Sequence, residues 1–297
     1  MQAVDLSMDI HPLSPVLGVE VKGVNLANAI EQKTFDAIRD ALHQHAVLLI
    51  RDQHLTPRQL VDLANRLGPL RTSFYNQYAV PDQPELTVVS NIVDPVSGRA
   101  IGIVDAGSLW HTDASYLRTP DMYTQLYALQ VPRDTNGTAL GDTLFTNTAA
   151  AYEALPADEQ KRLLAMTAVH SFEAHLEKKN AKAQLKRAPL TAEQKAKTPD
   201  VSHPIVRTHP VTGRKSLFVS EGHTARVDGL SASESQALLE QLWAHIKQPQ
   251  FVFRHRWAEN DLLIWDNCST QHLATMDYPA SQPRRLYRAG VAGTEPY

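Results

Sequence analysis

Two histidines and one aspartate in this chain have the side chains that can bind a catalytic metal ion. His111 and Asp113 lie in the segment WHTD at 110–113, and His272 follows the segment WDN at 265–267. Two imidazoles and one carboxylate on one face of an octahedral ion leave three positions open, which is the arrangement of non-haem Fe(II) oxygenases. The three residues therefore suggest an iron site.

Taken singly, these residues are weak evidence. A histidine two residues before an acidic residue also arises by chance in a chain with 13 histidines and 32 acidic residues, and we interpret His175 with Glu177 as such an accident. On a strand, residues two apart face the same side, so His111 and Asp113 can bind one ion together. The alternatives are a polar pair at a strand edge and, for His272, a core histidine bonded to a backbone carbonyl.

A run of arginines follows His272 and predicts an anion site. In the segment RRLYR at 284–288, Arg284 and Arg288 share one face of the expected strand. Two arginines on one buried face need anions, because an unpaired buried charge is very costly. Arginine holds a carboxylate through two parallel hydrogen bonds, so the pair suggests an acidic cosubstrate beside the iron. The alternative is a basic surface strand, against which apolar neighbours such as Leu286 argue.

The composition indicates a globular protein of ordinary charge. The chain has 297 residues, a net charge of −3 and 43% hydrophobic residues, enough for a substantial core. This charge implies neither nucleic acid nor an anionic membrane as a partner, and no apolar run reaches the ~18 residues of a membrane span. No secretory signal is evident, and Cys268 is the only cysteine, so we expect a cytoplasmic protein without an internal disulfide. We also expect a homo-oligomer.

Short strands make up most of the expected structure. Helices are predicted over 33–45, over 57–67 after a capping box at Thr56 and Gln59, and after a second capping box that begins at Ser231. Strands are expected over 47–50, 122–131, 205–208, 216–220, 251–257, 262–265 and 286–291. Many short strands with few helices favour a mainly β fold with flanking helices, in one domain over residues 1–297.

Residues 173–200 differ from the rest in composition, since lysines crowd there with few apolar residues. We interpret the segment as a solvated insertion or as a mobile lid over an active site. These two interpretations are compatible.

Taken together, the motifs resemble those of the taurine dioxygenase and 2,4-D dioxygenase family of Fe(II)/2-oxoglutarate-dependent dioxygenases. The resemblance covers residues 9–294 and rests on PLSPVLG at 12–18, WHTD at 110–113, GDTL at 141–144, HPIVRTHP at 203–210, WDN at 265–267, TQH at 270–272 and the arginine pair. It implies a double-stranded β-helix, a cupin-like jelly roll, that uses Fe(II), 2-oxoglutarate and O2.

The resemblance also implies roles for individual residues. The residues that match the family's iron ligands are His111, Asp113 and His272. Those that match the residues holding the distal carboxylate of 2-oxoglutarate are Arg284 and Thr143. Arg288 matches a second arginine, which in the taurine enzyme reaches the substrate's sulfonate.

The expected substrate pocket departs from that of the taurine enzyme. Ser73 stands where that enzyme has a sulfonate-binding histidine, and Gly107 stands where it has an asparagine. Tyr75 and Phe145 are candidates to line a more apolar pocket. We therefore expect a larger anionic substrate, such as a sulfonate, sulfate ester or aryloxy acid, ahead of taurine itself, with Arg288 holding its anionic group.

The implied reaction is hydroxylation of a substrate C–H bond, coupled to decarboxylation of 2-oxoglutarate to succinate. Where the attacked carbon bears a sulfonate, a sulfate ester oxygen or an aryl ether oxygen, the product collapses to a carbonyl compound. The ligand types alone leave two alternatives open. One is a zinc hydrolase, because histidine and carboxylate also bind zinc. The other is a non-catalytic metal-binding β-barrel, which would not need Arg284 and Thr143 to face the metal.

Overall fold

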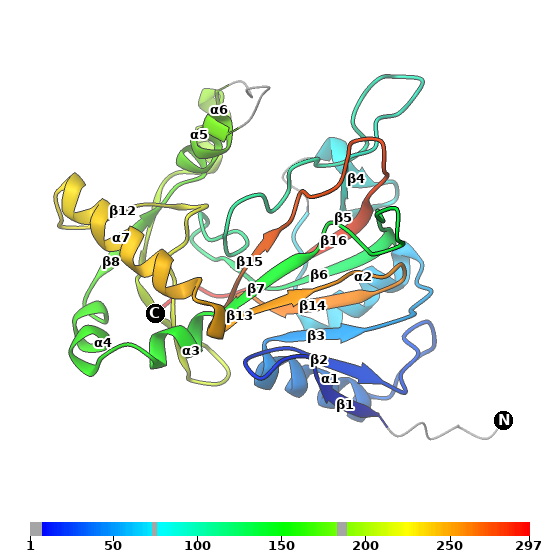
Figure 1. Cartoon of the computed structure of the whole chain (residues 1–297), viewed down its shortest axis with the longest axis horizontal. Coiled ribbons are helices and arrows are strands. Elements are labelled where there is room, and N and C mark those ends of the chain that lie inside the picture. The colour runs from blue at the N-terminus through cyan, green and yellow to red at the C-terminus, as the bar shows by residue number, and fades with distance from the viewer. Residues whose placement is uncertain (1–7, 73–75, 183–188) are drawn as a thin grey trace.

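An eight-stranded sheet forms the centre of this computed structural model, which describes residues 8–72, 76–182 and 189–297. The sheet has the order β1-β2-β3-β14-β6-β16-β5-β4, and its neighbours are antiparallel except β2 and β3 (Figure 1). Its strands are β1 (Asp9–Pro12), β2 (Val19–Lys22), β3 (Val47–Ile50), β4 (Ala79–Val80), β5 (Gln83–Ser90), β6 (Asp121–Gln130), β14 (Leu262–Asp266) and β16 (Arg285–Ala292).

Three smaller sheets complete the described β structure. One sheet has the order β13-β7-β15, another β12-β8-β9, and the third pairs β10 with β11. Their strands are β7 (Thr143–Asn147), β8 (Thr167–His170), β9 (Val201–Pro204), β10 (Val206–Thr208), β11 (Lys215–Leu217), β12 (Thr224–Val227), β13 (Val252–His255) and β15 (Thr270–Ala274). The predicted mainly β fold with helices is confirmed.

Two helices cover one face of the eight-stranded sheet, α1 (Gln32–His45) and α2 (Pro57–Leu67) (Figure 1). Phe35 of α1 and Leu60 of α2 are buried in one apolar cluster with Ile264 of β14. The predicted capping box is present, since Thr56 accepts a hydrogen bond from the Gln59 amide and the Gln59 side chain from the Thr56 amide. The packing of α1 and α2 on this face holds the strands of the eight-stranded sheet in place.

The opposite face of the sheet packs against β7 and β15. Leu126 of β6, Leu263 of β14 and Leu286 of β16 form a buried cluster with Phe145 of β7. Because side chains alternate along a strand, polar residues on this same face point into the space between the two sheets. This space holds the candidate site.

A separate apolar cluster joins α3 (Thr148–Glu153), α4 (Ala157–Leu163) and α7 (Ala232–Ile246) with β8 and β12. Helices α5 (Phe172–Lys182) and α6 (Ala192–Lys197) lie outside this cluster, and two short 3-10 turns lie at Asn76–Tyr78 and Pro249–Phe251. Ser231 caps α7 as predicted. Within the described ranges, no helix is long and apolar enough to cross a membrane.

The structure differs from the predicted elements in several places, and β5, β8, β9 and β12 are among the strands that no predicted range covers. The polar segments that form β7 and β15 carry no clear strand pattern and were not predicted. The described part of the lysine-rich segment 173–200 contains α5 and α6, and Lys179 is only 9% exposed because its ammonium pairs with Asp105 at 3.0 Å. A fully solvated segment is therefore wrong for α5.

Candidate metal centre and cosubstrate cavity

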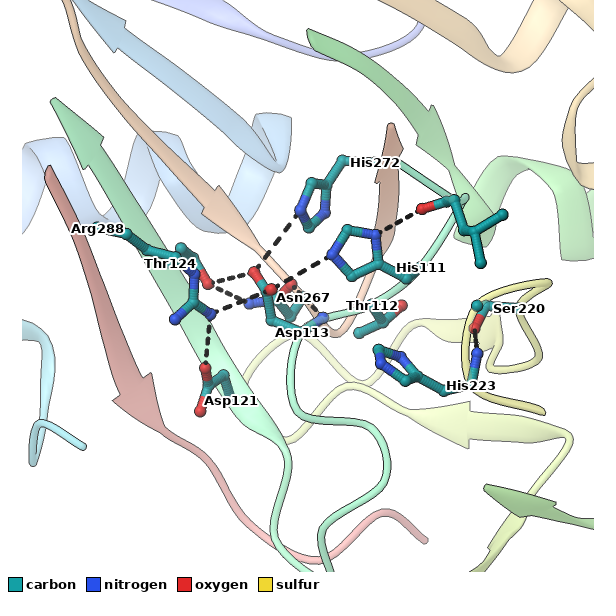
Figure 2. Close-up of polar contacts among 12 residues, drawn as sticks. His111, Thr112, Asp113, Asp121, Thr124, Ser220, His223, Asn267, His272 and Arg288 are labelled. Carbon is teal, nitrogen blue, oxygen red and sulfur yellow. Dashed lines mark hydrogen bonds and ion pairs between the residues drawn. The ribbon is translucent and has the colours of Figure 1, made fainter. Parts of the chain in front are cut away.

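The structure brings His111, Asp113 and His272 together. Their candidate ligand atoms all lie within 4.8 Å of one another. Asp113 Oδ1 lies 3.6 Å from His111 Nε2, and Asp113 Oδ2 lies 3.8 Å from His272 Nε2 (Figure 2). Adjacent ligands of an octahedral ion at roughly 2.1 Å lie ~3 Å apart, so a small inward movement completes one face of such an ion.

Backbone pairing positions the two histidines across 161 residues of sequence. His111 and His272 form an isolated antiparallel bridge, in which each amide donates to the other carbonyl, at 3.1 and 2.9 Å. The expected regular strand over His111 and Asp113 is wrong. Asp113 begins a turn in which Ala114 adopts a left-handed conformation with φ 53°, and this turn swings the carboxylate toward both imidazoles.

Hydrogen bonding and burial prepare the two imidazoles to bind a metal. His111 Nδ1 donates to the Leu109 carbonyl at 2.8 Å, so Nε2 is the ring nitrogen that faces Asp113. Burial lowers the pKa of His272 to about 3, which keeps this ring neutral at physiological pH. Both rings are therefore available as ligands.

Polar neighbours orient the Asp113 carboxylate. Thr124 of β6 donates its hydroxyl to Asp113 Oδ2 at 2.7 Å, and the Asp113 amide donates to Asn267 Oδ1 at 3.3 Å. Asn267 in turn donates to Thr124 at 3.0 Å (Figure 2). Burial opposes ionisation of Asp113, but the positive charge of Arg288 holds its pKa well below the usual range.

A cavity beside the triad contains the predicted cosubstrate residues. The cavity is lined by the triad together with Thr143, Arg284 and Arg288. Arg284 is 4% exposed, and it donates to the Gly141 carbonyl at 3.1 Å. Burial lowers the pKa of the Arg284 guanidinium by more than Tyr278, Asp277 and Asp142 raise it, so this buried cation is available for an anion that enters the cavity.

The sequence comparisons agree with this geometry. The family model described as taurine catabolism dioxygenase TauD, TfdA family, matches residues 9–289. The chain belongs to the TauD/TfdA family. It is a 2-oxoglutarate-dependent dioxygenase, with Fe(II), 2-oxoglutarate and O2 as its cofactor and cosubstrates.

Individual relatives are similar over almost their whole lengths. The 2,4-dichlorophenoxyacetate dioxygenase of Cupriavidus pinatubonensis is 32% identical, over 96% of this chain and 97% of the relative. The sulfate ester dioxygenase of Pseudomonas putida is 32% identical, over 98% and 91%. A crystal structure described as a taurine dioxygenase of Burkholderia xenovorans aligns with a TM-score of 0.79 at 30% identity, over 98% of this chain and 91% of that one.

The four candidate substrate-binding residues of this TauD/TfdA family member do not all lie at the cavity. Arg288 lines the cavity, whereas Ser73 and Tyr75 lie outside the described residues. Phe145 does not line the cavity, because it is fully buried behind His272, its cross-strand neighbour in β15. Phe145 therefore packs against His272 from the core, with the two rings stacked at a centroid distance of 5.9 Å.

Three polar residues near the metal centre had no predicted role. Thr124 and Asn267 orient Asp113, and Asp121 pairs with Arg288 at 3.1 Å. Asn267 could have been found, because an asparagine directly after an apolar strand is a polar group that must find a partner. Thr124 and Asp121 give no local signal, since their partners lie elsewhere in the chain.

Proposed function

We propose that this enzyme hydroxylates a C–H bond of a small anionic substrate, with collapse to a carbonyl product where the carbon bears a suitable leaving group. The observation that supports it most is the presence of a His-Asp-His triad and two arginines, Arg284 and Arg288, in one cavity. A zinc hydrolase or a simple metal-binding barrel would have no need of this buried anion site.

His111, Asp113 and His272 would hold the iron. Two imidazoles and one ionised carboxylate are a donor set that fits Fe(II) and leaves positions for a cosubstrate. When bound, Fe(II) with 2-oxoglutarate supplies the oxidative chemistry that inserts one oxygen atom of O2 into the substrate and yields succinate and CO2. The protein's part is to bind, orient and exclude water.

Arg284 and Thr143 would hold the distal carboxylate of 2-oxoglutarate. Arg284 is a buried cation without a carboxylate partner among the described residues, which is the condition an anionic cosubstrate satisfies. The Thr143 hydroxyl accepts a hydrogen bond from Trp257 Nε1 at 3.0 Å, which leaves its own proton for a second acceptor.

Arg288 would bind the anionic group of the primary substrate. Apolar side chains line the same cavity, among them Val89, Leu126 and Trp265. An apolar body with one acidic group fits these surroundings better than taurine, which has little apolar surface to bury. The names of the two relatives support this choice, since they act on an aryloxy acid and on sulfate esters.

The arrangement of the sheets supports a double-stranded β-helix in a single domain. The eight-stranded sheet and the β13-β7-β15 sheet pack face to face around the metal centre, as two layers of a jelly roll do.

Helix α5 would act as a cover for the cavity. Lys179 binds both the side chain and the carbonyl of Asp105, at 3.0 and 2.9 Å, two residues before the cavity-lining Gly107. The His175 ring lies 4.4 Å from His223, whose ring lies 5.7 Å from His111. Movement of α5 would therefore change the walls of the site, as a lid does.

The central test combines spectroscopy with turnover. Anaerobic addition of Fe(II) and 2-oxoglutarate to the apo-protein should give a visible charge-transfer band, which a zinc hydrolase or a non-catalytic barrel would not show. Succinate release should then be measured with aryloxyacetates, alkyl sulfates and taurine. We expect the larger anions to be preferred, and to lose turnover in Arg288→Ala. Efficient use of a neutral substrate, undiminished in Arg288→Ala, would contradict the anion assignment.

A further inference from the structure

Asp121 is a buried carboxylate that the proposed function does not use. It is 2% exposed at the first position of β6. Its Oδ1 accepts a hydrogen bond from Arg71 Nε at 2.6 Å, and its Oδ2 accepts one from Arg288 Nη2 at 3.1 Å. Arg288 Nη2 also lies 3.1 Å from Asp113 Oδ1 (Figure 2). One nitrogen atom of Arg288 is thus shared between Asp121 and the candidate metal ligand.

The backbone leaves space for this arrangement. A β-carbon on Gly290, in β16, would lie 2.6 Å from Asp121 Oδ2, so any larger residue there would displace the carboxylate. The register between β6 and β16 shifts between Val291 and Ala292, next to the pairing of Ala292 with Asp121. The carboxylate therefore lies directly against the strand that carries Arg288.

Metal binding creates an electrostatic conflict that Asp121 can relieve. A guanidinium 3.1 Å from Asp113 Oδ1 competes with a metal for that carboxylate, and it repels the bound divalent cation. If Asp113 were its only partner, metal binding would leave Arg288 as an unpaired cation in a largely buried site. Asp121 gives Arg288 a counter-ion of its own, and Arg71 holds Asp121 in place from the other side.

We propose that Asp121 is a positioning residue that gives Arg288 a carboxylate partner other than the metal ligand Asp113, so that metal and substrate anion can be bound together. This inference rests on the proposed roles of Asp113 and Arg288. Arg288 is then an arginine with its own counter-ion, whose remaining N–H groups are available to the substrate. Asp113, Arg288 and Asp121 share the charge at this end of the pocket.

The test is a double-mutant cycle read by metal titration of the metal-free protein. Binding of Co(II) is followed by its visible absorption in four proteins: wild type, Asp121→Asn, Arg288→Gln and the double variant. Loss of the negative charge of Asp121 weakens cation binding through space in either background. We expect this loss to be about tenfold or more greater when Arg288 is present than in the Arg288→Gln background. Equal losses in the two backgrounds would overturn the proposal.

Two controls separate this role from folding and from failure of the metal site. Asp261 is a matched buried carboxylate, paired with Arg51 at 2.7 Å, and Asp261→Asn should lower the melting temperature without weakening Co(II) binding. Should Asp121→Asn not fold, Arg71→Met removes the residue that holds Asp121 in place. Co(II) binding should then weaken more when Arg288 is present than in the Arg288→Gln background, and equal effects in the two backgrounds would overturn the proposal. Absence of Co(II) binding in the wild type would instead contradict the proposed metal site.

Discussion

Replacement of Arg284 by methionine should remove 2-oxoglutarate binding while leaving the apo-protein at least as stable. The Arg284 side chain is 4% exposed, burial lowers the pKa of its guanidinium, and its partners are the neutral Gly141 carbonyl and the Tyr278 side chain. Nearby Asp277 and Asp142 offset only part of the cost of burying this charge, and the remaining cost falls when an anion binds. Methionine removes that charge and keeps much of the side-chain volume.

The magnitude follows from the lost ion pair. A bidentate charged hydrogen bond contributes roughly 2–4 kcal/mol, which corresponds to a rise of about 30- to 1000-fold in the dissociation constant. At a ligand concentration of about 100 times the wild-type dissociation constant, binding stabilises the wild type by ~2.7 kcal/mol. In a chain of 297 residues this stabilisation raises the melting temperature by about 4 °C. The shift of Arg284→Met should then fall below about 1.5 °C.

The assay is thermal unfolding with and without 2-oxoglutarate, in the presence of Fe(II) and without O2. Arg285→Met is the matched control, because Arg285 is the next residue and donates to Tyr287 Oη at 3.1 Å on the opposite face of β16. This control should keep the full wild-type shift. A full shift in Arg284→Met, or its loss in Arg285→Met, would refute the assignment and indicate that Arg285 holds the cosubstrate.

Other substitutions should affect the metal, its neighbours and the cover separately. Alanine at any one of the three triad residues should abolish turnover and Co(II) binding with an unchanged circular dichroism spectrum. Turnover in one of these variants would show that the replaced residue is not a metal ligand. Thr124→Val removes the hydroxyl that donates to Asp113 at 2.7 Å and should weaken metal binding by about 10- to 100-fold in a calorimetric titration, whereas unchanged affinity would make this contact dispensable. Lys179→Met breaks the pairing with Asp105 and should speed amide hydrogen exchange in α5 but not in β16; unchanged exchange in α5 would contradict its role as a latched cover.

Features with a local signal were predictable from the sequence. The apolar run Val47–Ile50 is β3, and the capping boxes at Thr56 and Ser231 begin α2 and α7, because each depends on residues a few positions apart. The strands β7 and β15 escaped prediction because Thr143 and His272, which line the cavity, interrupt their apolar pattern. In contrast, β16 carries Arg288 and was predicted, because Leu286, Ala289 and Val291 keep its apolar pattern.

Long-range contacts account for the rest of what the sequence concealed. Phe145 was expected in the substrate pocket, and it does lie on the inner face of β7, but its cross-strand neighbour His272 covers it. Asp121 looked like an ordinary polar residue at a strand start, although its partner Arg288 lies 167 positions away. No window of sequence contains both members of such a pair.

Arg284, directly before β16, and Arg288, within β16, have different electrostatic surroundings. The burial of Arg284 is only partly offset by nearby carboxylates, so a cosubstrate bound there, as we propose, would gain a strong charge pair. Arg288 already contacts Asp113 and Asp121, so a substrate anion bound there would join an existing network and gain less from its charge. We therefore propose that charge governs retention of the metal and cosubstrate, and that the apolar lining around Leu126 governs the choice among anionic substrates.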